Sequence, residues 1–123
     1  MTLFLTIGDH FVSIASVFRE DDSAYPLGGC SVWWTATKRA GVLDDQAIAR
    51  TYWDALGTHE GIEIVQPNSG ELTVTLNPEQ TALFSPGSYY YDLQIHDAAG
   101  RIVTIDRGVL VARWSPTTRT TTP

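Results

Sequence analysis

The segment GSYYYDLQIHDAAGRIVTIDRGVLV, residues 87–111, decides the fold class of this chain. Successive side chains of an extended strand point to opposite faces, and one face here collects Tyr89, Tyr91, Leu93 and Ile95. The opposite face is more polar and carries Tyr90, Asp92 and His96. Residues 97–100 are typical of a turn, and a β-branched run follows at once. The segment therefore predicts a β-hairpin and, with it, an all-β domain.

The second strand of this hairpin does not alternate cleanly. Val103 and Ile105 share a phase with Val109, but Arg107 falls in that same phase. An extra residue would re-aim the strand and restore the alternation. We therefore predict a β-bulge at residues 106–108.

Length and composition indicate one domain with a real core. The chain has 123 residues, of which 43% are hydrophobic, and its formal net charge is -6. An acidic surface disfavours non-specific binding to nucleic acid, which requires excess Lys and Arg, and docking on an anionic membrane. We expect neither a nucleic-acid nor a membrane partner.

A single cysteine, Cys30, precludes an intramolecular disulfide and excludes paired-cysteine metal sites. We interpret it as a small buried hydrophobe rather than a reactive thiol. The N-terminal run MTLFLTIGDHF lacks a basic segment and a long apolar segment, so no signal peptide is predicted. No apolar run approaches membrane-spanning length.

Further short strands follow from the same alternation. Residues 2–7 predict an edge strand or an ordered arm, and residues 11–19 predict a strand with Val12, Ile14 and Phe18 on one face. Residues 31–37, 61–65 and 72–76 predict strands, with a hairpin turn at 67–70 and a short crossover, irregular or single-turn helical, that begins at 77–81. The regular spacing is typical of a sandwich. The predicted core consists of Val12, Ile14, Val32, Trp34, Ile62, Ile64, Leu72, Val74, Leu76, Tyr89, Tyr91, Leu93 and Ile95.

Residues 38–59 permit two interpretations. Asp44 and Asp45 favour a helix start, and Gly57 stands where a helix would end. Residues 47–53 also fit a strand followed by a loop. Because tertiary context overrides weak local propensity, we predict a strand here.

No pattern of catalytic residues stands out. His10, His59 and His96 lie beside turns or on polar faces, and no nucleophile-elbow motif is present. The carboxylates come as pairs, namely Asp21 with Asp22, Asp44 with Asp45, and Asp92 with Asp97. Adjacent strand residues face opposite ways, so such pairs make poor clamps. We predict a non-enzyme with no catalytic residue, no metal and no cofactor.

Aromatic residues are the more informative group. Alternation places Trp33 and Tyr90 on outer faces, and Trp114 begins a Thr- and Pro-rich C-terminal stretch. Exposed aromatics mark contact surfaces, so these three residues are the candidate interface. We favour a protein partner over a carbohydrate or receptor, for which Trp33, Trp53 or Trp114 would form a ring platform.

A series of short motifs resembles a known family. In chain order these are Gly8-Asp9, Leu27-Gly28-Gly29 before a Ser-Val-Trp strand, and residues 61–64, 70–76, 78–81, 86–94, 97–101, and Thr104 with Gly108 and Val111. Together they resemble the small Ig-like domains of tailed-bacteriophage tail and baseplate proteins, such as the N-terminal domain of siphophage baseplate upper proteins. The resemblance spans about residues 8 to 111. The stretch 38–59 departs from it by being longer and more helix-like.

The resemblance implies a fold and a setting. The fold is an Ig-like antiparallel β-sandwich of about seven to eight strands over residues 1–113, followed by a Thr/Pro-rich tail over 114–123. The function is that of a non-enzymatic virion structural protein in the tail or baseplate. Its partners would be other phage structural proteins and further copies of the chain. The baseplate proteins continue into a receptor-binding domain; a stand-alone copy would serve as a capsid decoration or head–tail adaptor protein. The location would be the virion, after synthesis in the bacterial host cytoplasm.

Overall fold

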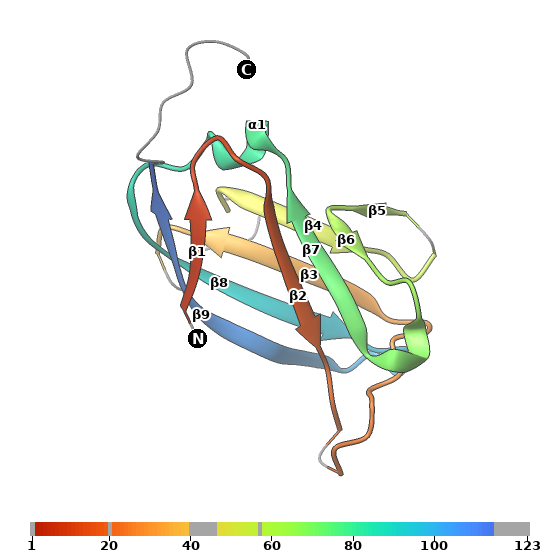
Figure 1. Cartoon of the computed structure of the whole chain (residues 1–123). Coiled ribbons are helices and arrows are strands. Elements are labelled where there is room, and N and C mark those ends of the chain that lie inside the picture. Colours follow the sequence, from red (N-terminus) through yellow and green to blue (C-terminus); the bar gives the residue numbers. More distant parts are fainter. Residues whose placement is uncertain (1, 20, 40–46, 57, 115–123) are drawn as a thin grey trace.

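Two β-sheets packed face to face make up the structure, a computed structural model that describes residues 2–19, 21–39, 47–56 and 58–114 (Figure 1). The all-β prediction is confirmed. The strands in these ranges are β1 (Thr2–Thr6), β2 (Phe11–Ser16), β3 (Ser31–Thr37), β4 (Ala49–Trp53), β5 (His59–Glu60), β6 (Ile62–Glu63), β7 (Glu71–Leu76), β8 (Gly87–His96) and β9 (Ile102–Arg113). The two-residue strands β5 and β6 bring the total in the described ranges to nine.

The large sheet has six strands in the order β1-β9-β8-β3-β4-β5, and the small sheet has three in the order β2-β7-β6. β1 lies at an edge of the large sheet, so the edge-strand prediction for residues 2–7 is confirmed. The paired strands are antiparallel as predicted except at this edge, where β1 runs parallel to β9. β1, the first strand, lies beside β9, the last strand, and the chain then crosses to the small sheet, where it forms β2 (Figure 1).

The core lies between the two sheets and follows the predicted alternation on most strands. Its predicted members from β3 onward are all buried, namely Val32, Trp34, Ile62, Ile64, Leu72, Val74, Leu76, Tyr89, Tyr91, Leu93 and Ile95. Leu5 of β1 and Leu110 of β9 join them at the β1 edge. The hairpin of β8 and β9 therefore supplies one wall of the sandwich, as expected.

The face of β2 was predicted wrongly. Val12 and Ile14 point to solvent with 59% and 66% of their surface exposed, whereas Phe11 is buried. Cross-strand partners share a face, and β2 pairs with β7 so that Phe11 is opposite the buried Leu76. The pairing register with β7 thus overrides the stronger apolar character of the alternate phase. Phe18, predicted on the same face, is also exposed.

An aromatic stack joins the two sheets at the centre of the core. The ring of Trp34 on β3 lies 5.9 Å from that of Phe11 on β2 and 6.0 Å from that of Tyr91 on β8. In immunoglobulin sandwiches a buried tryptophan on the third strand packs against a disulfide between the strands equivalent to β2 and β8. Here two aromatic rings occupy the corresponding places, which suits a chain with one cysteine.

A second immunoglobulin signature lies at the start of β8. The Tyr89 hydroxyl donates to the Ser85 carbonyl oxygen at 3.0 Å and accepts from the Ser85 N–H at 2.9 Å. This is the tyrosine corner of such domains, two residues before the inter-sheet position on that strand. The strand order, the buried tryptophan and this corner together define an immunoglobulin-type sandwich of the variable kind, in which extra strands extend the large sheet.

The connections match the predictions closely. A 3-10 turn, η2 (Pro67–Ser69), links β6 to β7, and Gly70 closes it with φ 71°. The crossover from β7 to β8 contains α1 (Pro78–Thr81), which Asn77 and Gln80 close with reciprocal side-chain bonds of 2.8 Å. A hairpin turn was predicted at 67–70, and of the two forms predicted for the crossover at 77–81 the structure has the single-turn helix.

Two further predictions concern β4 and β9. The strand expected at residues 47–53 is present as β4, while the alternative helix start at Asp44 and Asp45 and the cap at Gly57 lie outside the described residues. The bulge in β9 is present, but Ile105 is the extra residue, because Leu93 pairs with Asp106 and Gln94 with Thr104. It therefore falls just before the predicted position.

Candidate functional site: the outer face of the large sheet

Trp33 and Tyr90, two of the three predicted interface residues, share the outer face of the large sheet. Each alternates with buried neighbours, and Tyr90 is 49% exposed. Trp33 pairs with Gln94 and Tyr90 with Thr37, so the two side chains stand about 13 Å apart along β8. Trp114, 64% exposed, follows the last residue of β9 and lies beyond the sheet. The structure thus places two of the three on one face, at different ends of it.

Trp33 sits in an aromatic cluster rather than protruding alone. Its ring centroid lies 5.7 Å from that of Tyr52 on β4 and 6.2 Å from that of His96 on β8. The indole Nε1 is buried and has no hydrogen-bond acceptor among the described residues. Leaving such a donor unsatisfied costs on the order of 1–3 kcal/mol.

A row of apolar side chains crosses the other end of the same face. Phe4 pairs with Val111, and Tyr90 pairs with Val109, so all four point outward across β1, β9 and β8. We call these four residues the apolar strip. Phe4 is 56% exposed, and the Arg113 guanidinium lies 5.0 Å from its ring centre. Sequence reasoning missed Phe4, although its alternation with Leu3 and Leu5 is visible once the strand is assigned.

Charge on this face is mostly positive. Arg107 and Arg113 of β9 point outward, as does Arg50 of β4, which alternates with buried neighbours. Asp92 of β8 is the counter-charge at the centre, and its Oδ1 accepts a 2.8 Å hydrogen bond from the Thr35 hydroxyl. The excess of arginine on this face contrasts with the net charge of the whole chain, which is -6.

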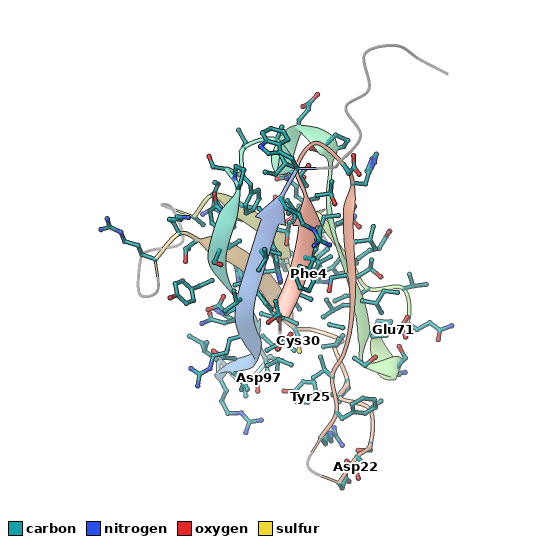
Figure 2. All side chains as sticks on the ribbon, turned by 60° about the vertical axis from the view of Figure 1, so that its left-hand side comes forward. Phe4, Asp22, Tyr25, Cys30, Glu71 and Asp97 are labelled. Atoms are coloured by element: carbon teal, nitrogen blue, oxygen red, sulfur yellow. The ribbon has the colours of Figure 1, made fainter. Side chains whose placement is uncertain are left out.

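The outer face of the small sheet has the opposite sign. Glu71 of β7, on the small-sheet side in Figure 2, and Glu63 of β6 are both exposed, and the residues of β2, β6 and β7 include no Lys or Arg. A shallow hollow of about 380 Å³ lies between these carboxylates and is lined by Glu63, Val65, Gln66, Ser69, Glu71 and Thr73. Val12 and Ile14 are exposed on the same face. The two outer faces of the sandwich therefore differ in charge but both expose apolar groups.

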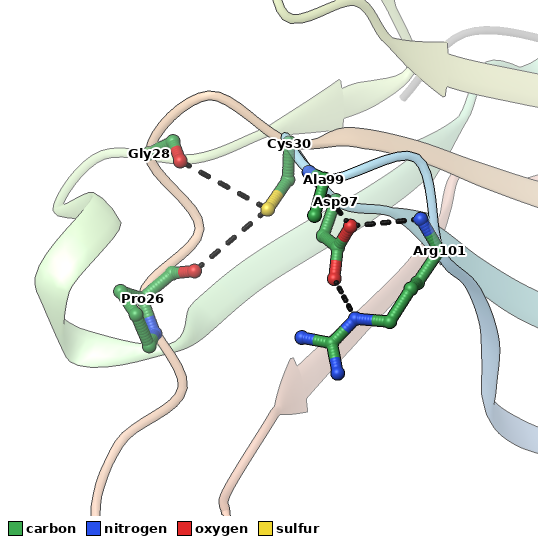
Figure 3. Close-up of polar contacts among 6 residues, drawn as sticks. All are labelled: Pro26, Gly28, Cys30, Asp97, Ala99 and Arg101. Carbon is green, nitrogen blue, oxygen red and sulfur yellow. Dashed lines mark hydrogen bonds and ion pairs between the residues drawn. The ribbon is translucent and has the colours of Figure 1, made fainter.

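The other polar candidates serve the fold (Figure 3). Asp97 caps the β8–β9 turn, accepting from the N–H groups of Ala99 and Arg101 at 3.0 and 2.9 Å and pairing with the Arg101 side chain at 2.9 Å. These hydrogen bonds hold the pKa of Asp97 below its usual value. Cys30 is buried, with its Sγ 3.8 and 3.9 Å from the carbonyl oxygens of Pro26 and Gly28. Burial, and next the Asp97 charge, raise the pKa of the Cys30 thiol.

The histidines are distributed over the molecule. His10 precedes β2, His96 ends β8 beside Trp33, and the His59 ring lies 4.9 Å from that of Trp53. Trp53 packs against the core rather than joining Trp33 on the outer face. In the described ranges, no three His, Cys, Asp or Glu side chains are grouped so as to hold a metal ion.

Comparison with known proteins does not assign this chain to a family. Neither a family model nor a curated protein matches this chain. None of the helical segments in the described part of the chain has the length and apolar character needed to cross a membrane. The chain is an immunoglobulin-type β-sandwich whose large-sheet outer face is the best candidate for a binding surface.

Proposed function

We propose that this protein is a non-enzymatic structural component of a tailed bacteriophage or prophage particle. It would be assembled in the tail or baseplate through protein–protein contacts. The observation that carries this proposal is the apolar strip on the large sheet, where Phe4 and Tyr90 expose aromatic rings over a continuous sheet surface. Exposed aromatic groups are enriched in protein interfaces. The resemblance to phage tail and baseplate domains supplies the setting.

The same surface would serve a capsid decoration or head–tail adaptor protein, the alternative within the virion. A carbohydrate- or receptor-binding module has less support. Of the three tryptophans that could form its ring platform, Trp53 packs against the core, Trp33 lies among Tyr52 and His96 on the outer face, and Trp114 lies past β9, so no two of them share a platform. The partners we propose are therefore other phage structural proteins and further copies of this chain.

Mass spectrometry of purified particles tests the proposal. We expect the protein to co-sediment with tail proteins in fixed proportion. Phe4→Ser combined with Tyr90→Ser should reduce its incorporation, because the variant loses the apolar strip. Leu83→Ser is the matched control, since Leu83 is an exposed apolar residue in the loop after α1, away from the strip.

Consistent absence from particles in which other tail proteins are detected would contradict the proposal. Normal incorporation of the strip variant would contradict the surface that we assign. Saturable sugar binding that disappears with Trp33→Ala would favour the carbohydrate-binding alternative.

A further inference from the structure

We infer that copies of this chain associate head to tail, with the small-sheet outer face of one copy against the large-sheet outer face of the next. The inference rests on the proposed structural role and names the partner that the large-sheet face would take. Three properties of the described residues support it. They are the charge of the two faces, their exposed apolar groups and their placement on the sandwich.

The charges of the two faces are complementary. The small-sheet face presents Glu63 and Glu71 around a shallow hollow and has no basic residue on its strands. The large-sheet face presents Arg107 and Arg113. An exposed arginine reaching the hollow would meet two carboxylates, the arrangement that a guanidinium favours. Opposite charges across an interface speed association and fix its register.

Both faces also expose apolar side chains that could pack against each other. Val12 and Ile14 are exposed on the small-sheet face, and Phe4 and Tyr90 are exposed on the large-sheet face. Each face thus combines an apolar row with charged neighbours. Two sheet faces pack about 10 Å apart through such side chains. Contact between unlike faces would remove both apolar rows from water while pairing the charges.

Association of like faces is disfavoured. Two small-sheet faces would bring Glu63 and Glu71 of one copy against the same carboxylates of the other. Two large-sheet faces would oppose Arg107 and Arg113 in the same way. Like charges brought together across an interface cost several kcal/mol in general. A second copy therefore fits in the heterologous orientation better than in a two-fold one.

Because the two faces lie on opposite sides of the sandwich, this contact can be repeated from copy to copy. They lie on opposite sides of one sandwich, so each copy that binds through one face leaves the other face free (Figure 1). Heterologous contacts of this kind generate rings when the rotation closes and open columns when it does not.

The test uses two variants of the full chain that each disable one face. The small-face variant carries Ile14→Lys with Glu71→Lys, and the large-face variant carries Phe4→Ser with Tyr90→Ser, which keeps Arg107 and Arg113 so that the two disabled faces repel each other. All four residues are exposed, so the fold should persist, which circular dichroism and thermal unfolding verify. Leu83→Lys is the control for an added charge at an exposed apolar position. Sedimentation velocity over a wide concentration range measures association.

We expect wild type and the control to form species larger than dimers as concentration rises, and less so at high salt. Each variant alone should associate at least about tenfold more weakly, which corresponds to about 1.4 kcal/mol. An equimolar mixture of the two variants should form a one-to-one dimer and stop there, because each partner retains one intact face.

A mixture that remains monomeric while wild type associates would overturn the head-to-tail contact, as would a variant that associates like wild type. Wild type that stays monomeric at the highest concentration would also overturn it. None of these results bears on whether the protein is found in particles, so failure here is distinguishable from failure of the proposed function.

Discussion

The three consecutive tyrosines that open β8 offer a controlled test of the tyrosine corner. Tyr89 is buried, and its hydroxyl makes two hydrogen bonds to the backbone of Ser85. Tyr89→Phe keeps the ring, and with it the edge-on contact with Phe84 at 4.9 Å, but removes both bonds. At about 0.5–1.5 kcal/mol net for each bond, the free energy of unfolding should fall by about 1–3 kcal/mol. The corresponding fall in melting temperature is about 4–12 °C.

Tyr90→Phe is the matched control, because it removes the same hydroxyl from the next position on the strand. Tyr90 is half exposed, and its hydroxyl makes no hydrogen bond to the described residues. Its substitution should change the free energy of unfolding by less than about 0.5 kcal/mol. Urea unfolding followed by tryptophan fluorescence measures both variants under the same conditions. Equal losses for the two variants would refute the assignment of Tyr89 as a corner that ties β8 to the preceding loop.

Two further predictions concern backbone strain and pH. Gly70 adopts φ 71°, and a Cβ placed there would clash with the Val17 carbonyl oxygen. Gly70→Ala should therefore lower the free energy of unfolding by at least about 1 kcal/mol in urea titrations, and an unchanged midpoint would contradict this. Burial, and next the charge of Asp106, raise the pKa of Tyr91 from 10.0 to about 12. The folded state thus favours the neutral phenol, and the resulting stabilisation is complete below pH 10 and is lost as the pH rises through about 12. The stability difference between wild type and Tyr91→Phe should shrink over that window, and a difference that stays constant would argue against the shift.

Much of the fold could be predicted because strong alternation and turn chemistry agree on the same elements. Tyr89, Tyr91 and Leu93 alternate with polar residues, and both pairing partners of β8 reinforce that phase. The crossover at α1 was also predictable, since Asn77 and Gln80 stand at capping-box spacing with proline between them. Local and tertiary preferences coincide at these places, so the sequence alone suffices.

Other features depend on pairing that no local pattern encodes. The parallel entry of β1 beside β9 joins segments more than a hundred residues apart, and the bulge at Ile105 depends on its register with β8. The interface prediction named single residues without their neighbours for the same reason. Trp33 was placed on the correct face, but its contacts with Tyr52 and His96 come from strands distant in sequence. A single strand shows which face a side chain takes and not which neighbours share it.

The error at β2 is itself informative about function. Val12 and Ile14 are β-branched and apolar, and alternation alone would bury them in place of Ser13 and Ala15. The register with β7 turns the larger apolar pair outward and leaves the smaller side chains facing the core. Val12 and Ile14 keep 59% and 66% of their surface exposed, so the monomer forgoes roughly 1–2 kcal/mol of burial energy for each side chain. Burial of Phe11 in the same register compensates for part of this loss inside the molecule, and the remaining compensation is expected at a functional surface. Contact with the large-sheet face of a second copy would provide it, because that face exposes the apolar strip and the arginines that the small sheet lacks.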